Sequence, residues 1–390
     1  MIPLKQCTLV LLFSLLNFLT QVHAENVDLS TPPAPTIAAS AYILKDFHTG
    51  KVLAENNADA KLAPASLTKI MTVYVIFNEL ASGHLHLDDN VTISEKAWKT
   101  SGSRMFVELG NQVKIEDLLK GVIIQSGNDA SVALAEHVGG SEETFAEMMN
   151  QHASRLGMIN THFKNSDGLP VPDHYTTARD LGLLTSALIK EFPEYYRWFS
   201  QKEFTFNKIT QQNRNKLLSR DESVDGVKTG FTDDAGYCLV ASALREDMRL
   251  ISVVMGAKDA NARANENQTL LNYGFRFFES HRLYEAKKSL NEARVWKGAN
   301  KTVSLGLVDE LYVTIPRRLY KDLKAVITVD KKITAPIAEG NKLGSVKVTL
   351  NNDLVEEKDL VALQSVEQGN IFQRLSESAM MMLEKSEDGK

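Results

Sequence analysis

The feature that most restricts how this chain can fold is a long apolar stretch that follows Pro64 and meets no glycine until Gly83. Proline suits the entry to a helix because its φ angle is fixed near the helical value. A helix that is apolar on nearly every side belongs in the middle of a domain. The stretch therefore predicts a buried central helix, which opens with the sequence Ser66-Leu67-Thr68-Lys69.

The spacing of Ser66 and Lys69 brings a hydroxyl and an amine together. Residues three apart on a helix lie about 5–6 Å apart at Cβ, and the first turn offers unpaired backbone N–H groups. A nucleophile beside a base, with donors for a developing oxyanion, is the minimum equipment for acyl transfer. A helix-capping serine followed by a lysine that extends to water would have the same spacing. Other segments of the chain must therefore distinguish a catalytic pair from this structural alternative.

A second segment, Ser126-Gly127-Asn128, falls in a turn between two predicted helices, 115–124 and 129–138. Ser126 can pass on a proton there, and Asn128 can hold Lys69 or a substrate amide. The motif is weak by itself, because Ser289-Leu290-Asn291 has the same pattern in a predicted loop.

A third segment, Lys228-Thr229-Gly230, falls on a predicted strand and occurs once in the chain. Lys228 and Thr229 can bind a carboxylate. Gly230 has no side chain, so a substrate backbone can approach the strand edge. These groups supply what the first segment lacks.

The rest of the chain predicts an α/β unit followed by a small all-β domain. A hairpin is expected over 41–56 and strands over 204–206, 227–229, 237–244 and 250–256, on either side of a helical middle. Strands at both ends of such a unit are expected to share one sheet. A closing helix is predicted over Ala264–Ser280. Short alternating segments follow, of which Val346–Leu350 is the clearest.

The two ends of the chain carry different signals. Lys5, an apolar core from Thr8 to Leu19 and the sequence Val22-His23-Ala24 predict a cleaved signal peptide, which would leave Cys238 as the one cysteine. The expected organisation is a signal peptide (1–24), a proline-rich tether (25–40), a catalytic domain (41–285), a β domain (290–368) and an amphipathic helix (369–390).

The terminal segment 369–390 can be read in two ways. One helical face gathers apolar residues, which is typical of a helix lying in a membrane interface; they are Ile371, Phe372, Leu375, Ala379, Met382 and Leu383. Acidic residues outnumber basic ones in the same segment, so anionic lipid should repel it. Docking on its own β domain, or a frayed tail, is the alternative.

Composition excludes some functions. The net charge of -5 gives no basic surface for nucleic acid. The scattered histidines have no carboxylate or cysteine at metal spacing, so neither a metal nor another cofactor is expected.

Together, and in this order, the three segments resemble the S-x-x-K, S-x-N and K-T-G set of penicillin-binding proteins and serine β-lactamases. The chain is further similar to the low-molecular-mass D-alanyl-D-alanine carboxypeptidases in its export signal, its Ser-Gly-Asn motif, its β domain and its terminal helix. Two other segments support this likeness: Gly102-Ser103-Arg104-Met105-Phe106 and Tyr273-Gly274-Phe275-Arg276-Phe277-Phe278. The resemblance covers essentially the whole mature chain.

The resemblance implies a penicillin-binding/serine β-lactamase-like domain, in which an antiparallel sheet carries a helical subdomain. It implies release of the terminal D-alanine from peptidoglycan stem peptides ending in D-Ala-D-Ala, covalent binding of β-lactams, and a periplasmic location, peripheral on the outer face of the inner membrane. The implied catalytic residues are Ser66, Lys69, Ser126 and Asn128. The implied substrate-binding residues are Lys228, Thr229, Gly230, Phe231 and Arg263.

By this likeness Ser66 is the acylated nucleophile and Lys69 its general base, while the backbone N–H groups of Ser66 and Phe231 hold the oxyanion. Some relatives have histidine at the position of Phe231. The phenylalanine of this chain puts the fine-tuning of substrate preference in doubt, but not the reaction. Lys69 must be neutral to accept a proton. A fall of ~3 units from a pKa near ~10.4 is expected from burial and from a nearby cation such as Lys228.

Three other functions are weighed against this one. A β-lactamase needs a second carboxylate in an E-x-x-L-N pattern, but Lys287 stands where the glutamate should be before Leu290-Asn291. A peptidoglycan endopeptidase or transpeptidase would use the same motifs, which do not fix the acyl acceptor. A non-catalytic cell-wall binding module would have no reason to keep Ser66, Lys69, Ser126 and Lys228.

Overall fold

The computed structural model describes residues 31–387, with side chains as far as residue 381. Its centre is a five-stranded antiparallel sheet in the order β2-β1-β9-β8-β7. The strands are β1 (Ala41–Asp46), β2 (Val52–Asn56), β7 (Val224–Thr232), β8 (Gly236–Arg245) and β9 (Met248–Ala257). β1 pairs with β9 over the whole length of β1, so the two ends of the unit share one sheet, as predicted.

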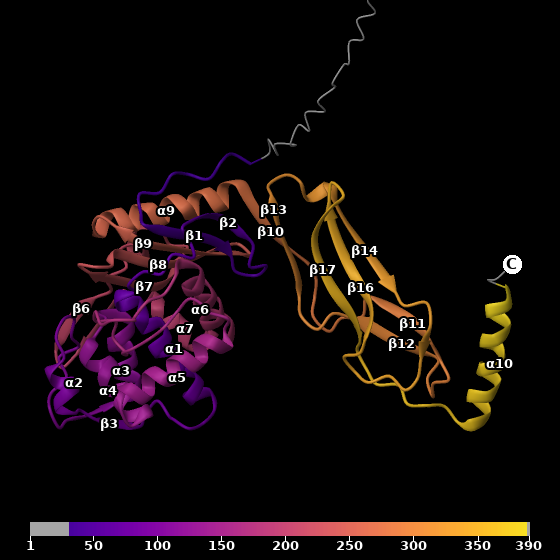
Figure 1. Ribbon diagram of the computed structural model, residues 1–390, viewed down its shortest axis with the longest axis horizontal. Helices are drawn as coiled ribbons and strands as arrows, with labels where there is room; N and C mark the ends of the chain where they lie inside the picture. Colours follow the sequence, from indigo (N-terminus) through magenta and orange to yellow (C-terminus); the bar gives the residue numbers. More distant parts are fainter. Residues whose placement is uncertain (1–30, 388–390) are drawn as a thin grey trace, which may run out of the picture.

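Helices cover both faces of this sheet (Figure 1). One face carries α9 (Ala260–Phe277), and the other carries a helical group built around α1 (Thr68–Ala81). Strands covered on both faces are expected to be apolar throughout, and the middle of β8 and β9 is fully buried. The helical group also contains α2 (Glu95–Lys99), α3 (Ile115–Lys120), η2 (Gly121–Gln125), α4 (Asn128–Gly139), α5 (Glu142–Arg155), α6 (Ala178–Glu191), α7 (Pro193–Tyr196) and η3 (Arg197–Ser200). The short helix α8 (Leu217–Arg220) packs on the α9 side of the sheet.

The central helix is buried as predicted, from Thr68 to Phe77. Ser66 differs from the prediction because it lies in a separate 3-10 turn, η1 (Ala65–Leu67), just before α1. Ala65 has a φ of 49°, outside the helical range. The nucleophile candidate therefore sits at a sharp bend of the backbone rather than inside the first α-helical turn.

Other boundaries also differ from the sequence prediction. α9 begins at Ala260, because the Asp259 side chain accepts from the N–H groups of Asn261 and Ala262 at 2.8 Å and caps the helix there. It ends at Phe277, so the helix predicted to Ser280 is wrong at both ends. The sequence also missed β3 (Asn90–Thr92), β4 (Gln112–Lys114) and β6 (Ile209–Gln212), which pairs with β5 (Glu203–Phe206). Such short strands carry too little alternation to be recognised.

The chain continues from α9 into an all-β part. β10 (Phe278–Tyr284) pairs with β13 (Leu311–Pro316), and a six-stranded sheet has the order β14-β16-β17-β12-β11-β15. Buried Val303, Leu305, Val346 and Leu360 belong to its core. The remaining elements are β11 (Asn291–Trp296), β12 (Thr302–Gly306), η4 (Tyr320–Asp322), β14 (Leu323–Val329), β15 (Ile333–Thr334), β16 (Lys342–Leu350) and β17 (Asp353–Ala362).

A partly buried polar cluster joins the two parts of the molecule. The Asp46 carboxylate accepts from Ser280 Oγ at 2.6 Å and from Thr49 Oγ1 at 2.9 Å. Thr314 Oγ1 lies 2.8 Å from Thr49 Oγ1 and 2.9 Å from Ser280 Oγ. β10 thus has its strand partner in the β part, whereas the predicted limit at residue 285 would assign it to the catalytic domain. The predicted domain limits themselves stay a prediction.

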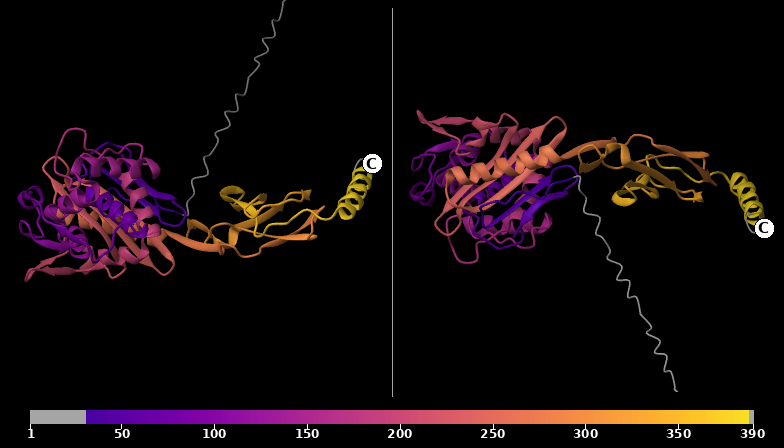
Figure 2. Two further views of the ribbon diagram at one scale, coloured as in Figure 1. Left: turned by 90° about the horizontal axis from the view of Figure 1, so that it is seen from below. Right: turned by 90° about the horizontal axis from the view of Figure 1, so that it is seen from above.

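The last helix, α10 (Ile371–Glu387), lies at the far end of the β part from the central sheet (Figures 1 and 2). Glu377 is buried and accepts from the backbone N–H of Lys297. Phe372 and Leu375 are 80% and 65% exposed. The helix thus touches the β part through a polar residue and leaves these apolar side chains in solvent. Met382 and Leu383, predicted on the same face, lie beyond the described side chains.

No helix among the described residues is both long enough and apolar enough to cross a bilayer. The predicted signal peptide (1–24) and the first part of the tether fall outside the described residues.

Candidate active site

Ser66 and Lys69 meet as the sequence predicts. Lys69 Nζ lies 3.1 Å from Ser66 Oγ, although the lysine is only 1% exposed. The bend at Ala65 turns the Ser66 hydroxyl into a cavity of about 620 Å³ that opens between the sheet and the helical group. The hydroxyl is therefore accessible to a substrate while its neighbouring amine is not.

Two further oxygen atoms surround the Lys69 amine. Asn128 Oδ1 lies 2.7 Å from Nζ, and the backbone oxygen of Asp167 lies 2.5 Å from it. Neither atom can donate a proton. A neutral amine has two N–H bonds and one lone pair, so the N–H bonds go to these two oxygens and the lone pair is left for the Ser66 hydroxyl. The geometry orients Lys69 as a base toward a single proton donor.

Burial lowers the pKa of Lys69 to about 8. The Asp167 carboxylate opposes this shift and raises the pKa, whereas the Arg214 guanidinium lowers it further. The fall is close to the ~3 units expected from the sequence, and Arg214 is a cation that contributes to it. A useful fraction of Lys69 is nonetheless neutral near pH 8.

The Ser126-Gly127-Asn128 segment lies in a turn, as predicted. Ser126 has a left-handed backbone (φ 61°) and joins the π-helical turn η2 to α4. Asn128 is held on two sides, because its Nδ2 donates to Ser101 O at 2.7 Å and its backbone N–H donates to Ser103 O at 2.7 Å. These bonds fix the side-chain amide so that Oδ1 faces Lys69.

A buried carboxylate holds the loop that supplies those two carbonyls. Asp129 Oδ1 accepts from the Met105 N–H, and Oδ2 accepts from the N–H of Phe106, both at 2.8 Å. Phe106 has a φ of 68°. Asp129 therefore secures the wall of the cavity formed by Gly102 and Ser103.

Lys228 connects the second and third segments. It is 3% exposed on β7, and its Nζ donates to Ser126 Oγ at 2.8 Å and to Thr229 O at 3.0 Å. Burial, followed by the charges of Lys69 and Arg214, holds the pKa of Lys228 well below its ordinary value. Through Ser126 and Asn128, the three motifs predicted from the sequence meet at one place.

Gly230 has a structural reason beyond the predicted approach of a substrate. A Cβ atom there would lie 3.1 Å from Pro64 O and 3.2 Å from Ala65 Cβ. The strand thus presses directly on the turn that carries the nucleophile. Arg263 donates from Nη1 to Gly230 O at 2.8 Å and lies in the first turn of α9, not ahead of the helix as predicted.

The cavity lining combines predicted and unpredicted residues. Predicted residues in contact with it are Ser66, Ser126, Asn128, Thr229, Gly230, Phe231 and Arg263. Phe231 is half-exposed, with its ring centroid 4.3 Å from that of Tyr237. Residues that the sequence did not single out for the site are Asp167, Gly168, Leu169, Arg214, Lys216, Thr232, Tyr237 and Ala260. The cations among them favour a substrate with an anionic end.

Asp167 and Arg214 are the most consequential omissions. Both lie in irregular loops, Asp167 between α5 and α6 and Arg214 between β6 and α8. The Asp-Gly pair at 167–168 is a turn signal, but it says nothing about chemistry. The residues next to Arg214 in the sequence form no motif that indicates a function. Among the described residues, no group of three histidine, cysteine or acidic side chains could hold a metal ion.

Comparison with known proteins agrees with this geometry. Residues 28–259 match the family of D-alanyl-D-alanine carboxypeptidases, peptidase family S11, and residues 278–368 match the C-terminal domain of penicillin-binding protein 5. The chain is 48% identical over 359 residues to D-alanyl-D-alanine carboxypeptidase DacC of Escherichia coli (strain K12), which covers 90% of both chains.

Solved structures show the same fold. Penicillin-binding protein 5 of Haemophilus influenzae superimposes with a TM-score of 0.82 at 42% identity, over 86% of this chain and all of the other. Penicillin-binding protein 6B of Escherichia coli gives 0.72 at 36% identity, over 87% of this chain. With its three motifs assembled around Ser66 and with relatives of this identity along most of its length, the chain belongs to the S11 family of D-alanyl-D-alanine carboxypeptidases.

Proposed function

We propose that this protein is a serine D-alanyl-D-alanine carboxypeptidase that removes the terminal D-alanine from peptidoglycan stem peptides through an acyl-enzyme on Ser66. The observation that carries the proposal is the environment of Lys69. Its amine is buried, its two N–H positions are occupied by Asn128 Oδ1 and Asp167 O, and its lone pair is left for Ser66. This is the arrangement that a general base for a serine nucleophile requires.

In the acylation step, Ser66 Oγ attacks the carbonyl carbon between the two D-alanines while its proton moves to Lys69. The oxyanion is stabilised by the backbone N–H groups of Ser66 and Phe231, and one such donor contributes ~2.7–4 kcal/mol. The C–N bond then breaks. Ser126, bonded to Lys228, lies on the path by which a proton reaches the leaving amine.

The terminal carboxylate of the substrate is assigned to the cationic side of the cavity. Thr229 supplies a hydroxyl, and Arg214 and Arg263 supply positive charge. Water then attacks the ester carbonyl, its oxygen forms the new C–O bond, and Ser66 Oγ leaves with a proton. A β-lactam would form the same ester with Ser66, because its strained amide occupies the place of the scissile bond.

The test is release of D-alanine from a peptide ending in D-Ala-D-Ala, measured together with labelling by a fluorescent penicillin. Wild type should release D-alanine and label, and Ser66→Ala should lose both by about 10⁴-fold or more. Release from Ser66→Ala at the wild-type rate would refute the mechanism. Products joined to a second peptide would indicate a transpeptidase, cleavage of cross-linked peptides an endopeptidase, and rapid turnover of the penicillin a β-lactamase.

We further propose that the protein is exported to the periplasm and is held peripherally at a membrane by α10. The sequence pattern of residues 1–24 supports export. The exposure of Ile371, Phe372 and Leu375 on α10 supports the membrane contact, since exposed apolar side chains of a helix favour an interface.

A further inference from the structure

The segment Ser166–Leu169 lies directly against the catalytic serine and lysine. Its Asp167 carbonyl takes one of the Lys69 N–H bonds at 2.5 Å. Gly168 has a φ of 84°, and a Cβ atom there would lie 1.9 Å from Ala65 O. The segment is therefore packed so closely on the nucleophile turn that only glycine fits. A small displacement of this segment would move the acceptor that orients Lys69.

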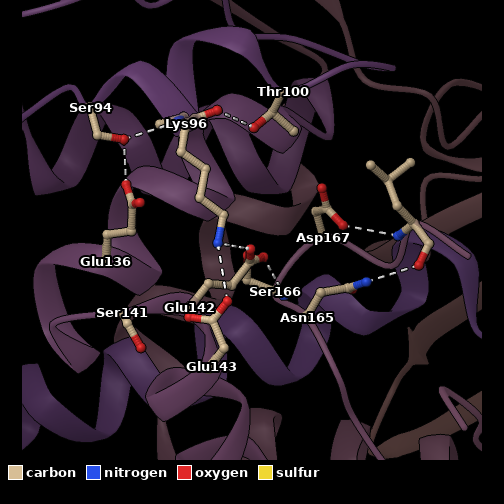
Figure 3. A network of polar contacts seen from close by, with 12 residues as sticks. Ser94, Lys96, Thr100, Glu136, Ser141, Glu142, Glu143, Asn165, Ser166 and Asp167 are labelled. Atoms are coloured by element: carbon tan, nitrogen blue, oxygen red, sulfur yellow. Dashed lines mark hydrogen bonds and ion pairs between the residues drawn. The ribbon is translucent and has the colours of Figure 1, made fainter. Parts of the chain in front are cut away.

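Two side chains from different helices hold Ser166 in this segment. Thr72 of α1 donates from Oγ1 to Ser166 O at 2.6 Å. Glu142, the first residue of α5, accepts through Oε1 from Ser166 N at 3.0 Å and from Ser166 Oγ at 2.8 Å. Figure 3 shows Glu142 between Ser166 and Lys96, whose Nζ lies 2.9 Å from Glu142 Oε2.

Glu142 is unusual for a residue at the start of a helix. It is only 9% exposed, whereas its neighbour Glu143 is exposed and also contacts Lys96, at 3.5 Å. The Oε1 atom of Glu142 accepts from two donors of a separate loop, the N–H and the hydroxyl of Ser166. Burying a carboxylate is costly unless its oxygens are paired. The bonds to Ser166 and to Lys96 offset this cost, and those to Ser166 fix the loop against α5.

We infer that Glu142 is a positioning residue of the active site: by fixing Ser166 it holds the Asp167 carbonyl on Lys69, and so keeps the Lys69 lone pair directed at Ser66. The connection runs through four residues in contact, Glu142, Ser166, Asp167 and Lys69. The inference rests on the proposed role of Lys69 as the base. It assigns a catalytic consequence to a side chain that does not line the substrate cavity.

The test must separate the effect of the Glu142 charge on Lys69 from the effect of the Glu142 contact with Ser166. The charged groups that act on Lys69 are Asp167, Asp129 and Glu142, which raise its pKa, and Arg214, which lowers it; Lys228 lies beside Ser126 in the same site. Glu142→Gln removes the charge but keeps an oxygen that can accept from Ser166. Glu142→Ala removes both. A change common to the two variants is therefore electrostatic, and a change confined to alanine is positional.

The experiment measures acylation by a fluorescent penicillin and D-alanine release from a D-Ala-D-Ala peptide across pH. Glu142→Ala should acylate about 10–100-fold more slowly, because small misplacements of catalytic groups have effects of this size. Its kcat should fall while KM stays within about twofold. Glu142→Gln should remain within about threefold of wild type. Both variants should move the acid limb of the pH profile to lower pH by the same amount.

Glu143→Gln and Glu143→Ala are the matched controls, since Glu143 shares the Lys96 contact but has none with Ser166 among the bonds described. Both should behave as wild type. A folded Glu142→Ala that acylates at the wild-type rate would overturn the inference, as would a Glu142→Gln as slow as the alanine variant. If Glu142→Ala does not fold, Glu142→Asp decides, because it keeps the charge but shortens the side chain and so withdraws the carboxylate from both Ser166 donors: a rate equal to wild type would overturn the inference.

The outcomes also distinguish this inference from the proposed function. Failure of the wild-type protein to label or to release D-alanine would refute the function itself. Normal activity in both the wild type and Glu142→Ala would refute the positioning role alone.

Discussion

At the scale of single residues, the chemistry depends on the burial and the neighbouring charges that lower the pKa of two lysines. Burial is the largest cause for both Lys69 and Lys228, and positive charge from Arg214 acts in the same direction. The opposing charge on Lys69 comes chiefly from Asp167. One residue thus plays two parts, because its carbonyl orients the amine and its carboxylate limits how far the pKa falls.

The pH dependence of acylation follows from the Lys69 pKa of about 8. The base is the neutral form, so its fraction rises with pH through this value and is lost below it. The rate of penicillin acylation should fall about tenfold for each pH unit below the pKa. Stopped-flow labelling between pH 5 and pH 9, at steps of about half a pH unit, would locate this acid limb of the pH profile. A rate independent of pH in this range would contradict the role of Lys69.

Asp167→Asn provides a directional check on the same residue. The change removes the carboxylate that raises the Lys69 pKa but keeps the backbone carbonyl that accepts its N–H. The acid limb should therefore move to lower pH. Asp173→Asn, at an exposed position of the same loop, is the control and should leave the limb in place. Movement of the Asp167→Asn limb to higher pH would show that another group controls the profile.

At the scale of elements, the site is made where three backbones press together. The turn η1 carries Ser66, β7 approaches it at Gly230, and the loop after α5 approaches it at Gly168. In both approaches the glycine leaves space that a side chain would fill. The nucleophile turn is consequently held from two sides, which explains how the bend at Ala65 is maintained.

Gly168→Ala tests this close packing. The new Cβ would collide with the Ala65 backbone oxygen, and the alanine would also have to adopt a positive φ. The two effects together should lower the free energy of unfolding by about 2–5 kcal/mol and should slow acylation. Gly157→Ala is the matched control, because Gly157 has a φ of 75° but nothing within 4 Å of its added Cβ.

The control should lose only the cost of the backbone conformation, about 1–2 kcal/mol, with acylation unchanged. Urea unfolding and penicillin labelling of both variants provide the measurements. Equal losses of stability in the two variants would show that contact with the nucleophile turn is unimportant.

At the scale of the whole molecule, the central sheet with its helices, which carries the active site, and α10 lie at opposite ends of an elongated protein (Figures 1 and 2). The cluster of Asp46, Thr49, Ser280 and Thr314 lies where the two parts meet, and each member is bonded to another. Buried polar groups are costly when they lose a partner, so this cluster resists separation of the parts. If α10 contacts a membrane, the β part would therefore hold the active site away from that surface.

Membrane contact can be measured by flotation with lipid vesicles. Wild type should float with phosphatidylcholine vesicles and less with phosphatidylglycerol vesicles at low salt, since acidic residues predominate in 369–390. The double variant Phe372→Asp/Leu375→Asp should not float with either. Val326→Asp, at another exposed apolar position, is the control and should float as wild type does. Wild type that stays unbound to phosphatidylcholine would refute the membrane role of α10.

Motifs in the sequence were enough to identify the reacting groups. Motif spacing predicted the pairing of Ser66 with Lys69, the turn at Ser126 and the strand at Lys228, because each depends on local periodicity and on residue types that few other positions combine. It also predicted the shared sheet, since a helical middle between strands leaves few other arrangements. The limits of α9 were wrong because its cap, Asp259, was not recognised.

The orientation and the charge of those groups depend on contacts that exist only in the folded chain. Asp167, Arg214 and Glu142 come from loops or from the start of a helix, where no period marks a side chain as functional. Their effects on Lys69 depend on distances across the fold and on burial, and both arise from packing between segments far apart in the chain. Motif spacing therefore names the nucleophile and its base, while the packing around Lys69 determines where its proton and its lone pair lie.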